Sequence, residues 1–103
     1  MNSVRIGICG WGNVATGLYK AIDSNSEQIK SAGNTNIDIV VIGARRDNPK
    51  CDPKETKIER DIFDVLDHDI DVMVELIGGV EVARELILAS IGKGIHVVTA
   101  NKA

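Results

Sequence analysis

The fold is decided by the stretch Gly10-Trp11-Gly12-Asn13-Val14-Ala15, which joins an apolar run to an amphipathic one. Residues 4–9 before it are mostly apolar and rich in β-branched side chains, which is typical of a buried parallel strand. After it, apolar residues recur at helical spacing as far as Ile29. We expect this helix to fade between Ser24 and Ser31 and to stop at Gly33-Asn34. A strand that ends in glycines and opens directly into a helix predicts a phosphate-binding turn.

Each position of this turn has a physical task. Gly10 permits the tight turn, Gly12 lets a pyrophosphate approach the backbone, and Ala15 keeps the helix close to the strand. The N–H groups of Asn13, Val14 and Ala15 would point at the phosphates, assisted by the helix dipole. Trp11 is expected either to shield the turn or face the cofactor, or to be a partly exposed aromatic residue. The turn therefore predicts dinucleotide binding.

The remaining apolar runs alternate between strand and helix patterns. We expect further strands at residues 37–44, 72–77 and 95–99, a short helical turn near Ile62 to Leu66, and a helix through Val82 to Ile91. Residues 45–57 are polar, contain both prolines and are interpreted as a loop. Strands alternating with helices predict an α/β fold, a Rossmann-type doubly wound parallel sheet truncated after the fourth strand.

Composition limits the class of protein. A chain of 103 residues, 44% apolar with a net charge of −3, suffices for one small domain, residues 1–103. No basic stripe is present, so nucleic acid and anionic membranes are not expected as partners. The two cysteines have no framework spacing: Cys9 is expected in the core and Cys51 as an unpaired loop thiol. With no long apolar N-terminal stretch, these features favour the cytoplasm.

The corner after the second strand bears on cofactor choice. NAD-specific sites place a carboxylate there, whereas this chain has Ala44-Arg45-Arg46. Guanidinium groups suit a 2′-phosphate, although the two arginines could also be ordinary solvated loop residues. We therefore favour NADP, with NAD also possible.

Several segments together resemble the N-terminal NAD(P)-binding domain of homoserine dehydrogenase. They are residues 7–14, the corner at 44–47, Val74-Glu75-Leu76-Ile77-Gly78-Gly79 and Val97-Val98-Thr99-Ala100-Asn101-Lys102-Ala103. The resemblance runs from about Val4 to the last residue. It implies an oxidoreductase that interconverts L-homoserine and L-aspartate 4-semialdehyde, a step of threonine, methionine and isoleucine biosynthesis in the aspartate pathway.

The resemblance also implies roles for individual residues. Residues 10–15 would hold the pyrophosphate, and Ala44, Arg45 and Arg46 would lie by the adenosine ribose. The nicotinamide side would be lined by Ile77, Gly78, Gly79, Thr99, Ala100, Asn101 and Lys102. Lys102 matches the family's active-site lysine and could polarise the aldehyde carbonyl or assist proton transfer. Further catalytic residues of the family would lie beyond this chain, so we expect it to be a fragment that is inactive alone.

Other assignments remain open. Buried in a predicted strand, Glu75 is either a structural carboxylate or a residue near the active cleft, and we favour the structural role. His68 and His96 have no partners at ligand spacing, so no metal site is expected. The alternative functions are a related amino-acid dehydrogenase, such as meso-diaminopimelate dehydrogenase, and a non-catalytic NAD(P)-sensing module. A homo-oligomer is expected, because the last strand would expose an edge and an apolar face.

Overall fold

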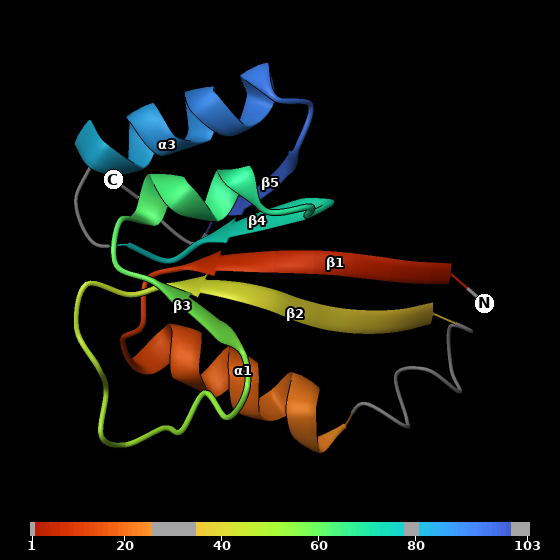
Figure 1. The fold of residues 1–103 in the computed structure, drawn as a ribbon, viewed down its shortest axis with the longest axis vertical. Coiled ribbons are helices and arrows are strands. Elements are labelled where there is room, and N and C mark those ends of the chain that lie inside the picture. Colours follow the sequence, from red (N-terminus) through yellow and green to blue (C-terminus); the bar gives the residue numbers. More distant parts are fainter. Residues whose placement is uncertain (1, 26–34, 78–80, 100–103) are drawn as a thin grey trace.

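A parallel sheet with helices on both faces forms the molecule (Figure 1). The computed structural model describes residues 2–25, 35–77 and 81–99. Along the chain the elements are β1 (Asn2–Cys9), α1 (Asn13–Ser24), β2 (Thr35–Gly43), β3 (Lys57–Glu59), the 3₁₀ helix η1 (Ile62–Asp67), β4 (Val72–Glu75), α3 (Glu81–Gly92) and β5 (His96–Thr99). The sheet order is β3-β2-β1-β4-β5, and every pairing is parallel.

This order confirms the predicted Rossmann-type α/β fold. The chain leaves β1 on one side to form β2 and β3, then crosses back to place β4 and β5 on the other side. The order therefore reverses between β1 and β4, and in open α/β sheets ligands bind outside the carboxyl ends of the strands at such a point. Gly10, which follows β1, lies at this reversal.

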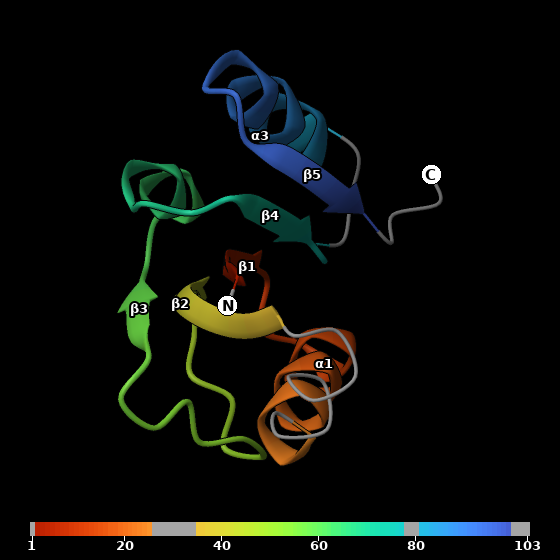
Figure 2. The same cartoon turned by 90° about the vertical axis from the view of Figure 1, so that its right-hand side faces the viewer.

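The sheet has two apolar faces because its strands alternate in burial direction. Ile8, Ile42 and Val74 pack on one face together with α1. Their neighbours Cys9, Val41 and Met73 pack on the other face with η1 and α3. Figure 2 shows the arrangement, with α1 on one side of the sheet and both η1 and α3 on the opposite side. Both faces of the central strands are thus covered, which explains their nearly continuous apolar sequence.

One strand was missed by the sequence prediction. The segment 57–59 pairs with β2 and forms a short edge strand, β3, where a loop through residue 57 was expected. Only Ile58 of its three residues is apolar, so the strand carries almost no alternating pattern. The sheet therefore has five strands among the described residues rather than four. The predicted fading of the first helix beyond Ser24 and its stop at Gly33 lie largely outside the described residues.

The two cysteines are both free and both buried. Cys9 is fully buried in the core, as predicted, and burial together with the charge of Glu75 raises the pKa of its thiol to about 12. Cys51 is also an unpaired thiol, but it packs in the core beside α1 rather than standing exposed in its loop. A thiol with so high a pKa is almost entirely protonated at neutral pH, so Cys9 is a packing residue.

Candidate nucleotide-binding site

Gly10 is the tightest point of the predicted phosphate-binding turn. Its φ of +109° lies in a region that side chains rarely adopt. A Cβ on Gly10 would also lie 2.8 Å from the Leu76 carbonyl oxygen. The Gly10 N–H donates to the Gly43 carbonyl oxygen at 2.8 Å. Gly10 therefore brings the ends of three strands together, and no other residue type fits there.

Gly12 differs from Gly10 in its surroundings. Its φ is −94°, and a Cβ built on it would meet nothing in the described protein within 4 Å. Neither backbone strain nor packing within the described chain requires glycine at this position. The open space above Gly12 is the feature that close approach of a pyrophosphate needs.

The N-terminus of α1 is prepared for an anion. Gly12 provides no side-chain cap, and the first turn contains no acidic residue. The first helical hydrogen bond runs from Thr16 N to Gly12 O at 2.9 Å, so the N–H groups of Asn13, Val14 and Ala15 precede it. Ala15 is only 1% exposed and packs α1 against the sheet, as predicted, whereas Val14 is exposed. Free N–H groups and the helix dipole together favour a phosphate here.

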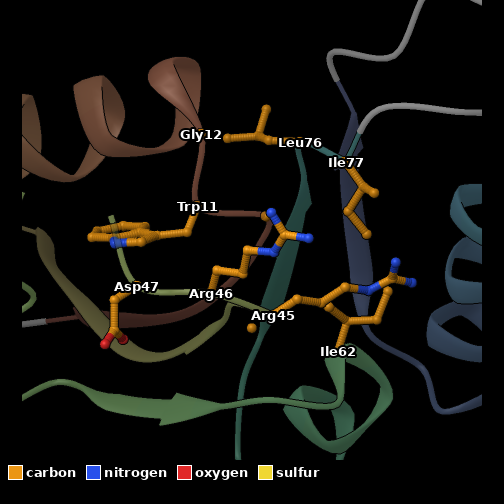
Figure 3. Close-up of a pocket in the computed structure, with 10 residues that line it drawn as sticks. Trp11, Gly12, Arg45, Arg46, Asp47, Ile62, Leu76 and Ile77 are labelled. Carbon is orange, nitrogen blue, oxygen red and sulfur yellow. The ribbon is translucent and has the colours of Figure 1, made fainter. Parts of the chain in front are cut away.

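A cleft of about 470 Å³ opens beside this turn (Figure 3). The turn, the β2 corner, the start of η1 and the chain just beyond β4 contribute its lining residues: Gly10, Trp11, Gly12, Gly43, Arg45, Arg46, Asp47, Ile62, Leu76 and Ile77. Most of these residues lie at or just beyond the carboxyl ends of β1, β2 and β4. The structure therefore gathers residues from three separate predicted segments around one cleft at the point where the strand order reverses.

Trp11 forms part of the cleft wall and is 9% exposed. Its ring meets Tyr19 of α1 edge-on, with the ring centroids 5.5 Å apart. Its carbonyl oxygen accepts a hydrogen bond from Asn48 Nδ2 at 3.1 Å. The alternative of a partly exposed aromatic residue is therefore wrong. Trp11 fixes the turn against α1 and the 45–56 loop and leaves one side facing the cleft.

The arginine corner lies on the opposite wall of the cleft. Ala44 is buried, and its N–H donates to Glu59 O of β3 at 2.9 Å. Arg45 and Arg46 are exposed, and neither forms an ion pair with another described residue. Figure 3 shows the two side chains projecting differently, Arg45 towards the side of Ile62 and Arg46 towards the side of the glycine turn. Two unpaired guanidinium groups therefore line a cleft that also borders a helix N-terminus.

Sequence reasoning missed Arg60. Its Nη1 donates to the Ala44 carbonyl oxygen at 3.1 Å, and its Nη2 lies 2.5 Å from Asp47 Oδ1. Arg60 thus supports the corner from β3 and engages its one carboxylate, Asp47. The only sequence signal was an arginine directly after Lys57–Glu59, and that segment had not been recognised as a strand.

The chain just beyond β4 lines the cleft, and β5 pairs with β4 next to it. Glu75 is fully buried; its Oε2 accepts from Ile77 N at 2.6 Å and its Oε1 from Thr99 Oγ1 at 2.7 Å. Ile77 lines the cleft, whereas Thr99 lies at the exposed end of β5. Glu75 is thus a hydrogen-bonded carboxylate, as the structural interpretation expected, but one of its partners, Ile77, lines the cleft. Gly78, Gly79, Ala100, Asn101 and Lys102 lie outside the described residues.

Comparisons with known proteins agree with this geometry. A family model described as "Homoserine dehydrogenase, NAD binding domain" matches residues 10–103. The chain belongs to this family. A homoserine dehydrogenase from Pseudomonas aeruginosa is 50% identical over 104 residues, which cover 100% of this chain and 24% of the relative. One from Methylobacillus glycogenes is 40% identical over 108 residues, covering 100% of this chain and 26% of the relative.

Solved structures of the family have the same fold. A homoserine dehydrogenase from Thiobacillus denitrificans superposes with a TM-score of 0.88 at 37% identity, covering 98% of this chain and 24% of that one. The Staphylococcus aureus enzyme superposes with a TM-score of 0.88 at 30% identity, covering 99% and 27%. The chain thus spans about a quarter of the length of these relatives. It corresponds to their NAD-binding part, which implies a nicotinamide cofactor.

The residues present fit such a cofactor. The open space at Gly12, the uncapped N-terminus of α1 and the cleft between the strand ends are the features that a dinucleotide requires. No group of three or more potential metal ligands occurs within the described ranges. Likewise, none of the helices in the described part of the chain is long and apolar enough to span a membrane.

Proposed function

We propose that the chain is the NADP-binding part of a homoserine dehydrogenase. The observation that carries the proposal is the cleft in which the open glycine turn faces Arg45 and Arg46. Residues 10–15 hold the pyrophosphate, and the two arginines contact the 2′-phosphate of the adenosine ribose. Ile77 and Thr99, together with residues 78, 79 and 100–102, border the nicotinamide.

The proposed reaction is the reversible oxidation of L-homoserine to L-aspartate 4-semialdehyde. When bound, the nicotinamide cofactor supplies the hydride acceptor or donor. Lys102 follows β5 in sequence, and ligands of open α/β sheets bind outside the carboxyl ends of the strands. An ammonium group there polarises the aldehyde carbonyl and assists proton transfer at its oxygen. The proposal places the protein in the cytoplasm, in threonine and methionine biosynthesis, and as a homo-oligomer.

A chimera tests the reaction. The chain would replace the matching segment of the Pseudomonas aeruginosa relative, to which it is 50% identical. We expect the chimera to reduce NADP when homoserine is added, and we expect Lys102→Ala to lower kcat by at least about 100-fold, the usual scale for a general acid or base. The rate is measured from NADPH absorbance.

Two outcomes of this experiment count against the proposal. A chimera that melts cooperatively but forms no NADPH with homoserine would contradict the proposed reaction. A chimera that binds NADP yet is inactive would favour the NAD(P)-sensing module instead. Unchanged activity of the Lys102→Ala chimera would remove the lysine from the mechanism.

The cofactor preference is tested separately at Arg45. In the chimera, Arg45→Ala should raise the KM for NADP by about tenfold, because an arginine–phosphate contact contributes roughly 1.4 kcal/mol or more. The KM for NAD, which has no 2′-phosphate, should change little. Lys50→Ala, which removes an exposed cation of the same loop outside the cleft, is the control. Equal losses with both cofactors would overturn the assignment of Arg45 to the 2′-phosphate.

A further inference from the structure

Glu75 is a fully buried carboxylate to which the proposed function gives no task. A charged group without water is costly unless hydrogen bonds compensate it. Both of its oxygens are engaged, Oε2 by the Ile77 N–H and Oε1 by the Thr99 hydroxyl. Ile77 follows β4, and Thr99 is the last residue of β5, where it is the register partner of Glu75. The carboxylate therefore ties two strand ends together beneath the site.

The same segment is also held from β1. Leu76 N donates to Cys9 O at 2.9 Å, and the Leu76 carbonyl lies so close to Gly10 that a Cβ there would collide with it. Leu76 and Ile77 both line the cleft. The path of the chain after β4 is thus fixed at two points, by β1 through Leu76 and by Glu75 through Ile77.

We propose that Glu75 is a positioning residue for the nicotinamide half of the cofactor, because its carboxylate sets the place of Ile77 and the orientation of the Thr99 hydroxyl. This proposal rests on the proposed function. In a doubly wound sheet the two nucleotide halves lie on either side of the strand reversal. The arginine corner of β2 occupies the adenosine side, so the ends of β4 and β5 occupy the other side.

The hydrogen-bond chemistry makes the role specific. A hydroxyl carries one proton and two lone pairs, whereas a carboxylate only accepts. Thr99 therefore donates its proton to Glu75 Oε1, and the position of the carboxylate sets the orientation of the hydroxyl. Removing the carboxylate releases the Thr99 side chain at the end of β5 as well as the Ile77 N–H.

The test compares two ligands by calorimetric titration of the chimera with the Pseudomonas aeruginosa relative. 2′,5′-ADP contains only the adenosine half with its phosphates, whereas NADPH adds the nicotinamide half. Glu75→Leu removes both acceptor oxygens and puts an apolar side chain in their place. In this variant we expect the affinity for 2′,5′-ADP to be retained. The affinity for NADPH should fall by about tenfold, to that of the adenosine half alone. Glu75→Gln, which keeps one acceptor oxygen, should restore part of the loss.

A ligand-free readout accompanies the titration. The Ile77 N–H loses its acceptor in Glu75→Leu, so its hydrogen exchange should accelerate by about tenfold or more, whereas the Thr16 N–H, bonded to Gly12 O in α1, should not change. Should Glu75→Leu not fold, Thr99→Val carries the ligand test, with Thr99→Ser as the matched control that keeps the hydroxyl. Thr99→Val should lose NADPH affinity and Thr99→Ser should keep it.

The outcomes separate this role from the proposed function. Equal loss of both ligands, full NADPH affinity in Glu75→Leu, or unchanged Ile77 exchange would overturn the positioning role. So would Thr99→Val binding NADPH as well as Thr99→Ser does. If the chimera with unmodified Glu75 bound neither ligand, that result would count against NADP binding, while Ile77 exchange in the chain would still decide whether Glu75 holds the end of β4.

Discussion

Gly10 and Gly12 stand two residues apart and are glycines for different reasons. The conformation and packing of the protein demand Gly10, since its φ is positive and Leu76 O lies where a Cβ would be. Gly12 has an ordinary extended conformation and open space around it. A side chain at Gly12 would therefore obstruct only the proposed pyrophosphate, and this difference can be measured.

Gly12→Ser should separate folding from binding. Serine is a strong helix N-cap, and its Oγ can accept from an N–H of the first turn, so stability should be unchanged or rise by roughly a few tenths of a kcal/mol. Because the hydroxyl then accepts from N–H groups of the first turn that would otherwise bind the pyrophosphate, the KM of the chimera for NADP should rise by at least about tenfold. Thermal unfolding and steady-state kinetics provide the two measurements.

Gly17→Ala is the matched control for this prediction. Gly17 is an exposed interior position of α1, and a Cβ there also meets nothing within 4 Å. Alanine should raise the stability by about 1 kcal/mol through helix propensity and leave the KM unchanged. If Gly12→Ser kept the original KM, the turn would not be the pyrophosphate site.

At the scale of elements, the success of prediction followed the strength of the pattern. β1, β2 and β4 are buried on both faces, so their apolar runs identified them, with ends that differ by one or two residues. β3 was not predicted because it is a short edge strand with one apolar residue, so its sequence shows no alternation of apolar and polar residues. The contacts of Trp11, Arg60 and Glu75 could not be predicted, because each depends on a partner distant in sequence that only the fold brings near.

A carboxylate at the opposite end of the sheet stabilises the start of β1. The Arg5 N–H donates to Asp71 Oδ2 at 2.8 Å, and the Arg5 guanidinium lies 3.3 Å from Asp71 Oδ1. The backbone hydrogen bond first, and then the guanidinium, lower the pKa of Asp71 below its ordinary value. Because the pKa of Asp71 is lower in the folded state, its charge contributes fully to the stability of the fold above the unfolded-state pKa of about 4. This stabilisation is lost as the pH falls through the folded-state pKa.

Asp71→Asn should therefore lower the Tm at neutral pH, and the difference from the unmodified chain should shrink as the pH falls below about 4. Melting curves across this range provide the measurement. The control is Asp38→Asn, which changes an exposed carboxylate of β2 that forms no hydrogen bond with the described residues. A Tm difference that stayed constant down to acidic pH would show that the charge of Asp71 is not what stabilises β1.

The whole molecule corresponds to the NAD-binding part of its relatives and leaves apolar side chains exposed at the β5 edge of the sheet. It spans about a quarter of the relatives that it matches, and it leaves Val98 of β5 and Leu88 and Ile91 of α3 more than half exposed. Exposed apolar side chains on an edge strand and its covering helix are typical of surfaces that another part of a protein covers. The cofactor would thus be held from one side only.

For this reason we expect the purified chain to bind NADP(H) weakly or not at all by itself and to form no NADPH from homoserine. A cofactor gains its affinity from contacts on both sides, and the reacting atoms must be held in place by groups that a single wall does not supply. NADPH absorbance with homoserine, and calorimetry with NADPH, provide the measurements, with the chimera as the positive control. Homoserine-dependent NADPH formation by the 103-residue chain alone would show that its own residues complete the site.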